Sequence, residues 1–346
     1  MTESRALHRV LIDLMKLRVV VLLQVTAVCA ILVHDLLVRY GSIAGDRSWL
    51  DTVTAVSITL VGGTLSAGGS NAINMWYDAD IDPLMARTAK RPIPSGEISP
   101  RAALLFGLLI STGGSAVFLL AHWKAAFWSA FSVLFYVLVY TVWLKRRSPQ
   151  NIVIGGIAGA TPPLIGWAVA AAETGALAGM NPLDLGSPVP WMLFVLIFLW
   201  TPPHFWALAL YRSGEYAKAH VPMMNEVRGA AHTLLQSKIY CGFLLALGVV
   251  PILWPESGLP LLWTLAATGL TVWYAASVWN IDPEEPFDTN GRMPKAARSF
   301  FRSLYYLGWM FLMLVLISAI PPDVLGPLGI RDARPGVCAS IEAMSL

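Results

Sequence analysis

Residues 53–92 read VTAVSITLVGGTLSAGGSNAINMWYDADIDPLMARTAKRP, an apolar stretch that passes directly into Asn, Asp and then Arg. Its apolar part, 53–73, is long enough to cross a bilayer as a helix, which takes about 20 mostly apolar residues. Ionisable side chains at the end of such a helix are costly in apolar surroundings and are usually functional. We therefore expect a membrane helix that carries a polar site at one end.

The whole chain has the composition of a membrane protein. Of its 346 residues 56% are hydrophobic and only 13% are charged, about half the charged fraction of a soluble domain. Nine apolar runs of sufficient length are found, so we predict an all-α polytopic membrane protein with about nine transmembrane helices. The predicted spans are 19–38, 53–73, 103–121, 125–144, 152–172, 190–211, 236–254, 259–280 and 303–322.

The Lys and Arg residues give the expected orientation. If the chain alternates across nine spans, all but five of the 24 basic residues fall on one side, and positive residues are retained on the cytoplasmic side. The five exceptions are Arg39, Arg47, Lys124, Arg331 and Arg334. We therefore expect a cytoplasmic N-terminal segment at 1–18, a membrane domain at 19–322 and a C-terminal tail at 323–346. A net charge of only +3 gives no support to nucleic-acid binding.

The first polar segment places oxygen ligands along one stripe of a helix. With Asn74 set to zero, Asn71, Asp78 and Asp82 fall within about 80° of it, whereas Asp80 points to the opposite side. Two carboxylates and two amides on one stripe suit Mg²⁺, which prefers oxygen ligands and leaves positions for water or substrate. We expect Asn74, Asp78 and Asp82 to bind the metal.

Basic residues follow this stripe directly. Pro83 is expected to end the helix, and Arg87, Lys90 and Arg91 come next. A planar guanidinium binds phosphate oxygens in pairs. The segment therefore predicts a magnesium and diphosphate site, against the alternative of a solvated loop with incidental charges.

A second polar segment, WTPPHFWALALYRSGEYAKAHVPMMNEVRG at 200–229, lies on the same predicted side. If its helix continues, His204, Tyr211, Glu215 and Lys218 share one face within about 60°. Lys218 would then bind diphosphate, Glu215 would complete a second metal site, and His204 and Tyr211 would contact the organic acceptor. For His204 the simpler interpretation is a packed, hydrogen-bonded core residue.

These motifs resemble the UbiA-type membrane prenyltransferases over nearly the whole chain. The family's NxxxDxxxD motif stands here as Asn74 to Asp82, and Asn71, MARTAKRPIPSGEISP at 85–100 and TPPHFWALAL at 201–210 resemble the haem-modifying branch. The second acidic motif departs from the family pattern, because RSGE precedes Tyr216 where aspartates are usual, and Glu226 is an alternative to Glu215 as the missing carboxylate.

The resemblance implies a UbiA-type helical bundle that transfers a farnesyl group from farnesyl diphosphate to a vinyl group of haem B, with addition of water, giving haem O. It implies Mg²⁺ as cofactor and Asn71, Asn74, Asp78, Asp82, Arg87 and Arg91 as catalytic residues. Haem A synthase or terminal-oxidase assembly factors would be downstream partners.

Two alternatives stay open at this point. The first is a UbiA-type transferase that acts on an aromatic or quinone-precursor acceptor, and the second is an ion-coupled transporter, since polar breaks in membrane helices also build ion-coupled sites. The lack of a long basic presequence favours a bacterial inner membrane, with the active site facing the cytoplasm. The oligomeric state is not predicted.

Overall fold

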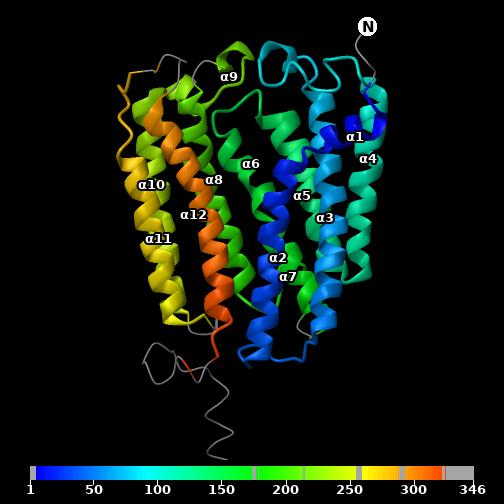
Figure 1. The fold of residues 1–346 in the computed structure, drawn as a ribbon, viewed down its shortest axis with the longest axis vertical. Helices are drawn as coiled ribbons and strands as arrows, with labels where there is room; N and C mark the ends of the chain where they lie inside the picture. The colour runs from blue at the N-terminus through cyan, green and yellow to red at the C-terminus, as the bar shows by residue number, and fades with distance from the viewer. Residues whose placement is uncertain are drawn as a thin grey trace, which may run out of the picture.

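The protein folds as a bundle of long, roughly parallel helices (Figure 1). The structure, a computed structural model, describes residues 5–173, 177, 179–212, 215–254, 259–286, 288, 293–321 and 324, without the side chains of Glu173 and Glu215. Within this part of the chain all regular structure is helical, and nine helices are long and apolar enough to cross a membrane. This confirms the predicted fold class. Apart from residue 324, the predicted C-terminal tail lies outside the described residues.

Several spans are built from more than one helical piece. α4 continues as the 3₁₀ turn η2, α5 continues as the π-helix η3, and α6 and α7 together form one span interrupted at Thr161 before two prolines. The elements are α1 (Leu7–Met15), α2 (Leu17–Arg39), α3 (Trp49–Tyr77), η1 (Asp82–Leu84), α4 (Pro100–Val117), η2 (Phe118–Leu120), α5 (Trp123–Leu134), η3 (Phe135–Leu144), α6 (Asn151–Ala160), α7 (Pro162–Ala170), η4 (Ala171–Glu173), α8 (Val189–Tyr211), α9 (Glu215–Lys218), α10 (Met224–Leu253), α11 (Leu261–Trp279) and α12 (Pro294–Ser318).

Small residues bring α3, which carries the first polar segment, close to its neighbour α4. A Cβ on Gly69 would lie 2.5 Å from the backbone nitrogen of Ser111, and one on Gly114 would lie 2.3 Å from that of Ser66. Close backbone approach of this kind is how membrane helices gain packing energy without a hydrophobic driving force. The end of α3 is therefore held on a rigid support.

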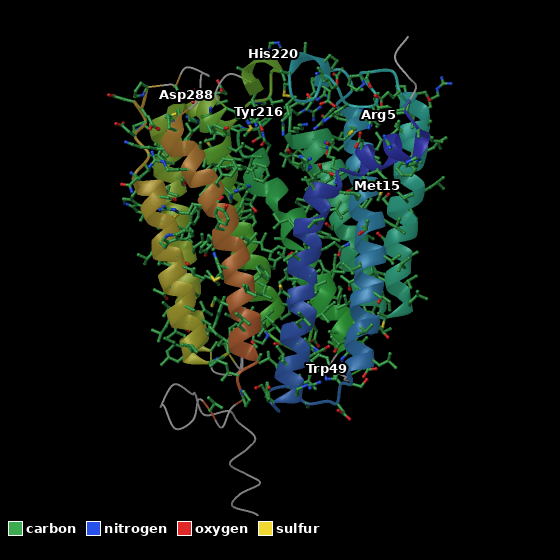
Figure 2. All side chains as sticks on the ribbon, in the orientation of Figure 1. Arg5, Met15, Trp49, Tyr216, His220 and Asp288 are labelled. Atoms are coloured by element: carbon green, nitrogen blue, oxygen red, sulfur yellow. The ribbon has the colours of Figure 1, made fainter. Side chains whose placement is uncertain are left out.

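The two polar segments lie at the same end of the bundle. The turns between α3 and α4, the short helix α9 and the N-terminal helix α1 all gather at the upper end in Figure 1, opposite the loop that joins α2 to α3. In Figure 2, Tyr216, His220 and Arg5 mark this end, and Trp49 marks the other. The predicted convergence of the two segments on one end is therefore observed in the structure.

The opposite end contains a buried ion pair. Asp35 of α2 accepts a hydrogen bond from Nε of Arg47 at 3.1 Å and one from the Thr52 hydroxyl at 2.6 Å, and all three residues are buried. Lys124 is also buried and donates to the carbonyl of Asp184 at 2.7 Å. Two of the five basic residues assigned to this side thus have structural partners.

Candidate functional site

The end of α3 buries the two carboxylates of the first motif. The helix ends at Tyr77, six residues before Pro83, so the expectation that Pro83 ends it was wrong. The Asp82 amide nevertheless donates to the Asp78 carbonyl at 2.9 Å. This hydrogen bond between residues four apart forms one further helix-like turn after α3. Both side chains are fully buried and remain on one side, as predicted. Asp80 points outward, with 63% of its side chain exposed.

Asp78 is surrounded by three donors, one from α3 and two from the residues that follow η3. Lys145 forms a short ion pair with its Oδ2, Asn74 Nδ2 donates to the same oxygen at 3.0 Å, and an Arg146 nitrogen lies 3.7 Å from Oδ1. Arg146 makes its closer contacts with Asp80, at 2.7 Å. The buried Asp78 carboxylate is therefore held mainly by a lysine from the end of η3.

Asp82 is held by the basic turn that follows it. Nη1 of Arg91 alone bridges both carboxylate oxygens, at 2.7 and 2.8 Å. The turn is fixed by the Thr88 hydroxyl, which donates to the Asp82 carbonyl at 2.7 Å, and by the Arg91 amide, which donates to the Thr88 carbonyl at 3.0 Å. Arg91, predicted from the sequence to bind diphosphate, therefore contacts the predicted metal ligand Asp82 through one nitrogen in this structure.

A third cation enters from the N-terminal side. Lys16 lies at the break between α1 and α2, where its backbone is left-handed with φ of 50°. Its Nζ donates to Oδ1 of Asn74 at 2.8 Å. On the same face of α3, Asn71 donates to the Met15 carbonyl at 3.0 Å, so both amides tie α3 to the α1–α2 junction. Figure 2 shows Met15 next to this junction.

The geometry of η3 explains how Lys145 reaches Asp78. The Lys145 amide donates to the Tyr140 carbonyl at 2.8 Å, a step of five residues that widens the turn. Such π-type turns are rare and often mark functional sites. In the same stretch the Thr141 hydroxyl accepts a hydrogen bond from Nδ2 of Asn74 at 3.2 Å. The Tyr136 ring stacks on the Tyr140 ring, with 5.4 Å between their centroids.

The charges at this end perturb one another. Burial raises the pKa of Asp82, the Arg91 guanidinium opposes that rise and the neighbouring Asp78 carboxylate adds to it. The pKa of exposed Asp80 is lowered instead, mainly by its hydrogen bonds from Arg146. Burial lowers the pKa of Lys16, and the nearby Arg91 and Lys145 cations lower it further. The site thus holds several ionisable groups away from water.

The donor set fits a divalent cation that is shared with a ligand. Oδ1 of Asp78 is buried without a hydrogen-bond partner, and the carboxylate of Asp82 and the amide oxygen of Asn74 are hard oxygen donors. Among the described side chains, no three His, Cys, Asp or Glu are grouped tightly enough to hold a metal alone. Oxygen atoms from a bound diphosphate would have to complete the coordination.

The remaining basic residues of the prediction are exposed on the segments that follow η1 and α8, which we call the rim residues. Arg87 and Lys90 are exposed in the turns between η1 and α4, and Lys218 is exposed on α9. The second polar segment does pack against the first: Ile81 and Met85 share an apolar cluster with Ala209 of α8 and Val221 beyond α9. The two segments therefore form one end wall.

The helix on which the shared face of the second segment depended does not continue to Glu215 and Lys218. α8 ends at Tyr211, where Arg212 adopts a non-helical backbone, and α9 is a separate short helix at Glu215–Lys218. The extrapolation from His204 to Lys218 assumed one continuous helix. The Glu215 side chain lies outside the described residues, and Glu226 is exposed in the first turn of α10.

His204 packs against α12, and Tyr211 lies in an apolar cluster that includes α10. The His204 ring stacks between Trp200 and Phe300, with centroids 4.2 and 4.8 Å away, and its Nδ1 lies 2.5 Å from the Ser303 hydroxyl. Tyr211 packs in a separate cluster with Leu210, Leu234 and Ile281. The predicted contact of either residue with an acceptor remains a hypothesis.

Sequence reasoning missed three residues of the site. Lys16, Lys145 and Arg146 were counted only as markers of membrane orientation, yet Lys16 and Lys145 contact the predicted ligands directly. Their signal in the sequence is their position, since each stands directly at the end of an apolar span on the same predicted side as Asp78.

Comparison with known proteins places this architecture in a family. The profile of the UbiA prenyltransferase family matches residues 36–305. A protoheme IX farnesyltransferase of Parvibaculum lavamentivorans is 45% identical over 73% of this chain and 74% of that protein. One of Bartonella bacilliformis is 40% identical over 88% of this chain and 89% of that protein.

Solved structures agree on the fold. A structure of digeranylgeranylglyceryl phosphate synthase has a TM-score of 0.67 at 14% identity, covering 90% of this chain and 98% of that one. A UbiA homolog from Archaeoglobus fulgidus bound to DMAPP and Mg²⁺ has a TM-score of 0.56 at 15% identity, covering 88% of this chain and 99% of that one. By its sequence, and in agreement with its fold, this chain belongs to the UbiA prenyltransferase family.

Proposed function

We propose that this enzyme transfers the farnesyl group of farnesyl diphosphate to a vinyl group of haem B, giving haem O and diphosphate. The family makes it a prenyltransferase, and its relatives at 40–45% identity bear the name protoheme IX farnesyltransferase. The single structural observation that carries the proposal is the pair of fully buried carboxylates, Asp78 and Asp82, surrounded by cations. This arrangement suits a diphosphate leaving group with its metal.

The chain's own residues have distinct parts in this reaction. Asp78, Asp82 and Asn74 would hold Mg²⁺, which supplies positive charge against the diphosphate oxygens when bound. Arg91 and Lys145 lie beside these ligands and would stabilise the charge that develops as the allylic C–O bond breaks. The vinyl carbon of haem then bonds to the farnesyl carbon, and water adds its hydroxyl to the resulting cation while its proton leaves.

The rim residues would receive the substrates. Arg87, Lys90 and Lys218 are exposed and would attract the diphosphate from water, since clustered charge of one sign steers an oppositely charged ligand. Asn71 would position α3 through its bond to the α1–α2 junction. His204 remains our candidate for acceptor contact because of the family motif, and Tyr211 because it lies about two turns from His204 on the same helix, α8.

A second metal site is a separate proposal. Either Glu215 or Glu226 would supply its carboxylate. The Mg²⁺ dependence of turnover in Glu215→Gln and Glu226→Gln distinguishes them, because only the ligand variant should need more metal. Unchanged dependence in both variants would remove this segment from metal binding.

We further propose that the enzyme resides in a bacterial inner membrane with the site facing the cytoplasm. The excess of basic residues at the end that holds the site supports this orientation. Its product would pass to haem A synthase or to terminal-oxidase assembly.

The deciding experiment incubates the purified protein in detergent with haem B, farnesyl diphosphate and Mg²⁺, with and without a chelator. Chromatography and mass spectrometry should show a more lipophilic haem that has gained a farnesyl group plus water, and none with chelator. Prenylation of an aromatic acceptor with haem untouched would refute the haem assignment while keeping the family chemistry. Folded protein that prenylates neither acceptor would refute both.

A further inference from the structure

We propose that Lys16, Arg91 and Lys145 are internal counter-cations that occupy the metal ligands until a diphosphate arrives, so that metal and diphosphate must bind together. This proposal rests on the proposed function only in placing a metal and a diphosphate at Asp78 and Asp82. It concerns how the site is loaded.

Each expected ligand already has a positive partner. Arg91 Nη1 bridges both oxygens of Asp82, and Lys145 contacts Oδ2 of Asp78. Lys16 donates to the amide oxygen of Asn74, the third candidate ligand. Apart from Oδ1 of Asp78, which has no hydrogen-bond partner, these are the oxygen atoms that a metal would use, so a metal and the three cations compete for them.

The local charge makes this competition strong. The buried carboxylates of Asp78 and Asp82 are already paired with Lys145 and Arg91, and exposed Asp80 is paired with Arg146, so no carboxylate is left without a compensating cation. A divalent cation alone would bring a net positive charge into surroundings where charges are poorly screened. A metal that arrives with a diphosphate brings compensating negative charge.

The diphosphate also gives the displaced cations a new partner. Lys145 lies at the end of η3, and Lys16 lies at the α1–α2 break. Neither residue is packed within the middle of a helix, so small side-chain rotations could move the ammonium groups from the ligands to phosphate oxygens. By linkage, diphosphate must then raise metal affinity by the same factor as metal raises diphosphate affinity.

The test measures metal binding without catalysis. Mn²⁺, which accepts the same oxygen ligands, is titrated into the full chain in detergent and followed by its paramagnetic resonance signal, with and without inorganic pyrophosphate. Titrations without protein correct for the complex that forms in solution. For the wild type we expect weak binding of Mn²⁺ alone and at least a tenfold gain with pyrophosphate.

The discriminating variant is Lys145→Met, which keeps the length of the side chain and removes its charge. We expect Mn²⁺ alone to bind this variant about tenfold more tightly than the wild type, and pyrophosphate to add much less. Lys145→Arg should keep the wild-type pattern. Lys238→Met is the matched control, because Lys238 contacts the Trp279 ring on the α10–α11 side, and it should change nothing.

Either of two results would overturn the proposal. The first is strong binding of Mn²⁺ by the wild type without pyrophosphate, and the second is a Lys145→Met protein that binds Mn²⁺ no better than the wild type. If Lys145→Met does not fold, Lys16→Met replaces it with the same expectations. Neither haem nor a farnesyl group is present, so failure of haem farnesylation leaves these outcomes unaffected.

Discussion

Removal of the Arg91 charge should make the enzyme sensitive to acid. Asp82 must be a carboxylate to bind a metal, and its pKa is already raised by burial, with Arg91 as the main opposing group. In Arg91→Met that opposition is lost, so the pKa of Asp82 rises further. The carboxylate form exists above the pKa and disappears as the pH falls, so the acid limb of activity should move to higher pH.

The size of the effect follows from the contact. One guanidinium nitrogen at 2.7 and 2.8 Å from a fully buried carboxylate is a charged hydrogen bond, of a kind worth about 1.5–3 kcal/mol. At about 1.36 kcal/mol per factor of ten, kcat/KM on the acid side should fall roughly 10- to 150-fold. At alkaline pH this part of the loss should vanish because Asp82 is then ionised in both proteins, and only the pH-independent loss of the Arg91 charge beside the diphosphate should remain.

The assay is the rate of haem farnesylation from pH 5 to 9 at fixed free Mg²⁺. Arg91→Lys should retain most of the acid limb, since a single nitrogen makes the contact and an ammonium can replace it. Arg101→Met removes an exposed charge at the start of α4 and should leave the profile unchanged. Parallel profiles for Arg91→Met and the wild type across the whole range would refute the reasoning.

Three further substitutions test other parts of the structure. Asp78→Asn should abolish product at near-normal protein abundance, whereas Asp80→Asn, which removes an exposed ion pair, should cost less than about tenfold in rate. Gly69→Ala should lower the free energy of unfolding by about 1–3 kcal/mol, because the added Cβ would lie 2.5 Å from the α4 backbone. Gly113→Ala should have little effect, because nothing lies within 4 Å of its added Cβ. His204→Phe keeps the ring stack and removes the polar atoms, so we expect KM for haem B to rise at least tenfold with KM for farnesyl diphosphate unchanged; equal KM values would make His204 a packing residue.

The helices were predictable from the sequence, but their ends were less so. All nine predicted spans correspond to helices, yet α12 begins at Pro294, well before the predicted start at 303, and α10, which is broken at Gly229, is helical again from 230, before the predicted start at 236. The prediction placed the starts at the edge of the apolar run. A helix extends beyond the bilayer when its polar first turns can face water, and hydropathy does not detect that extension.

The local half of the site was also predictable. Asn74, Asp78 and Asp82 lie within nine residues, so helical pitch alone places them together, even though α3 ends at Tyr77. Lys16 and Lys145 reach them only through a left-handed break and a π-helix. Neither irregularity has a pattern in the sequence, and contacts between distant segments depend on packing that periodicity does not describe.

The basic residues at this end therefore serve two purposes, membrane orientation and pairing with buried carboxylates, and a count of Lys and Arg on each side of the membrane does not separate them. Exposed residues such as Arg87 and Lys90 are where an insertion signal would place them. Lys145, by contrast, is mostly buried against a carboxylate, with 14% of its side chain exposed. A buried charge is stable only with a partner, so Lys145 is present because Asp78 is present. The charge asymmetry of this chain thus reports both its orientation and the place where an anionic group is handled.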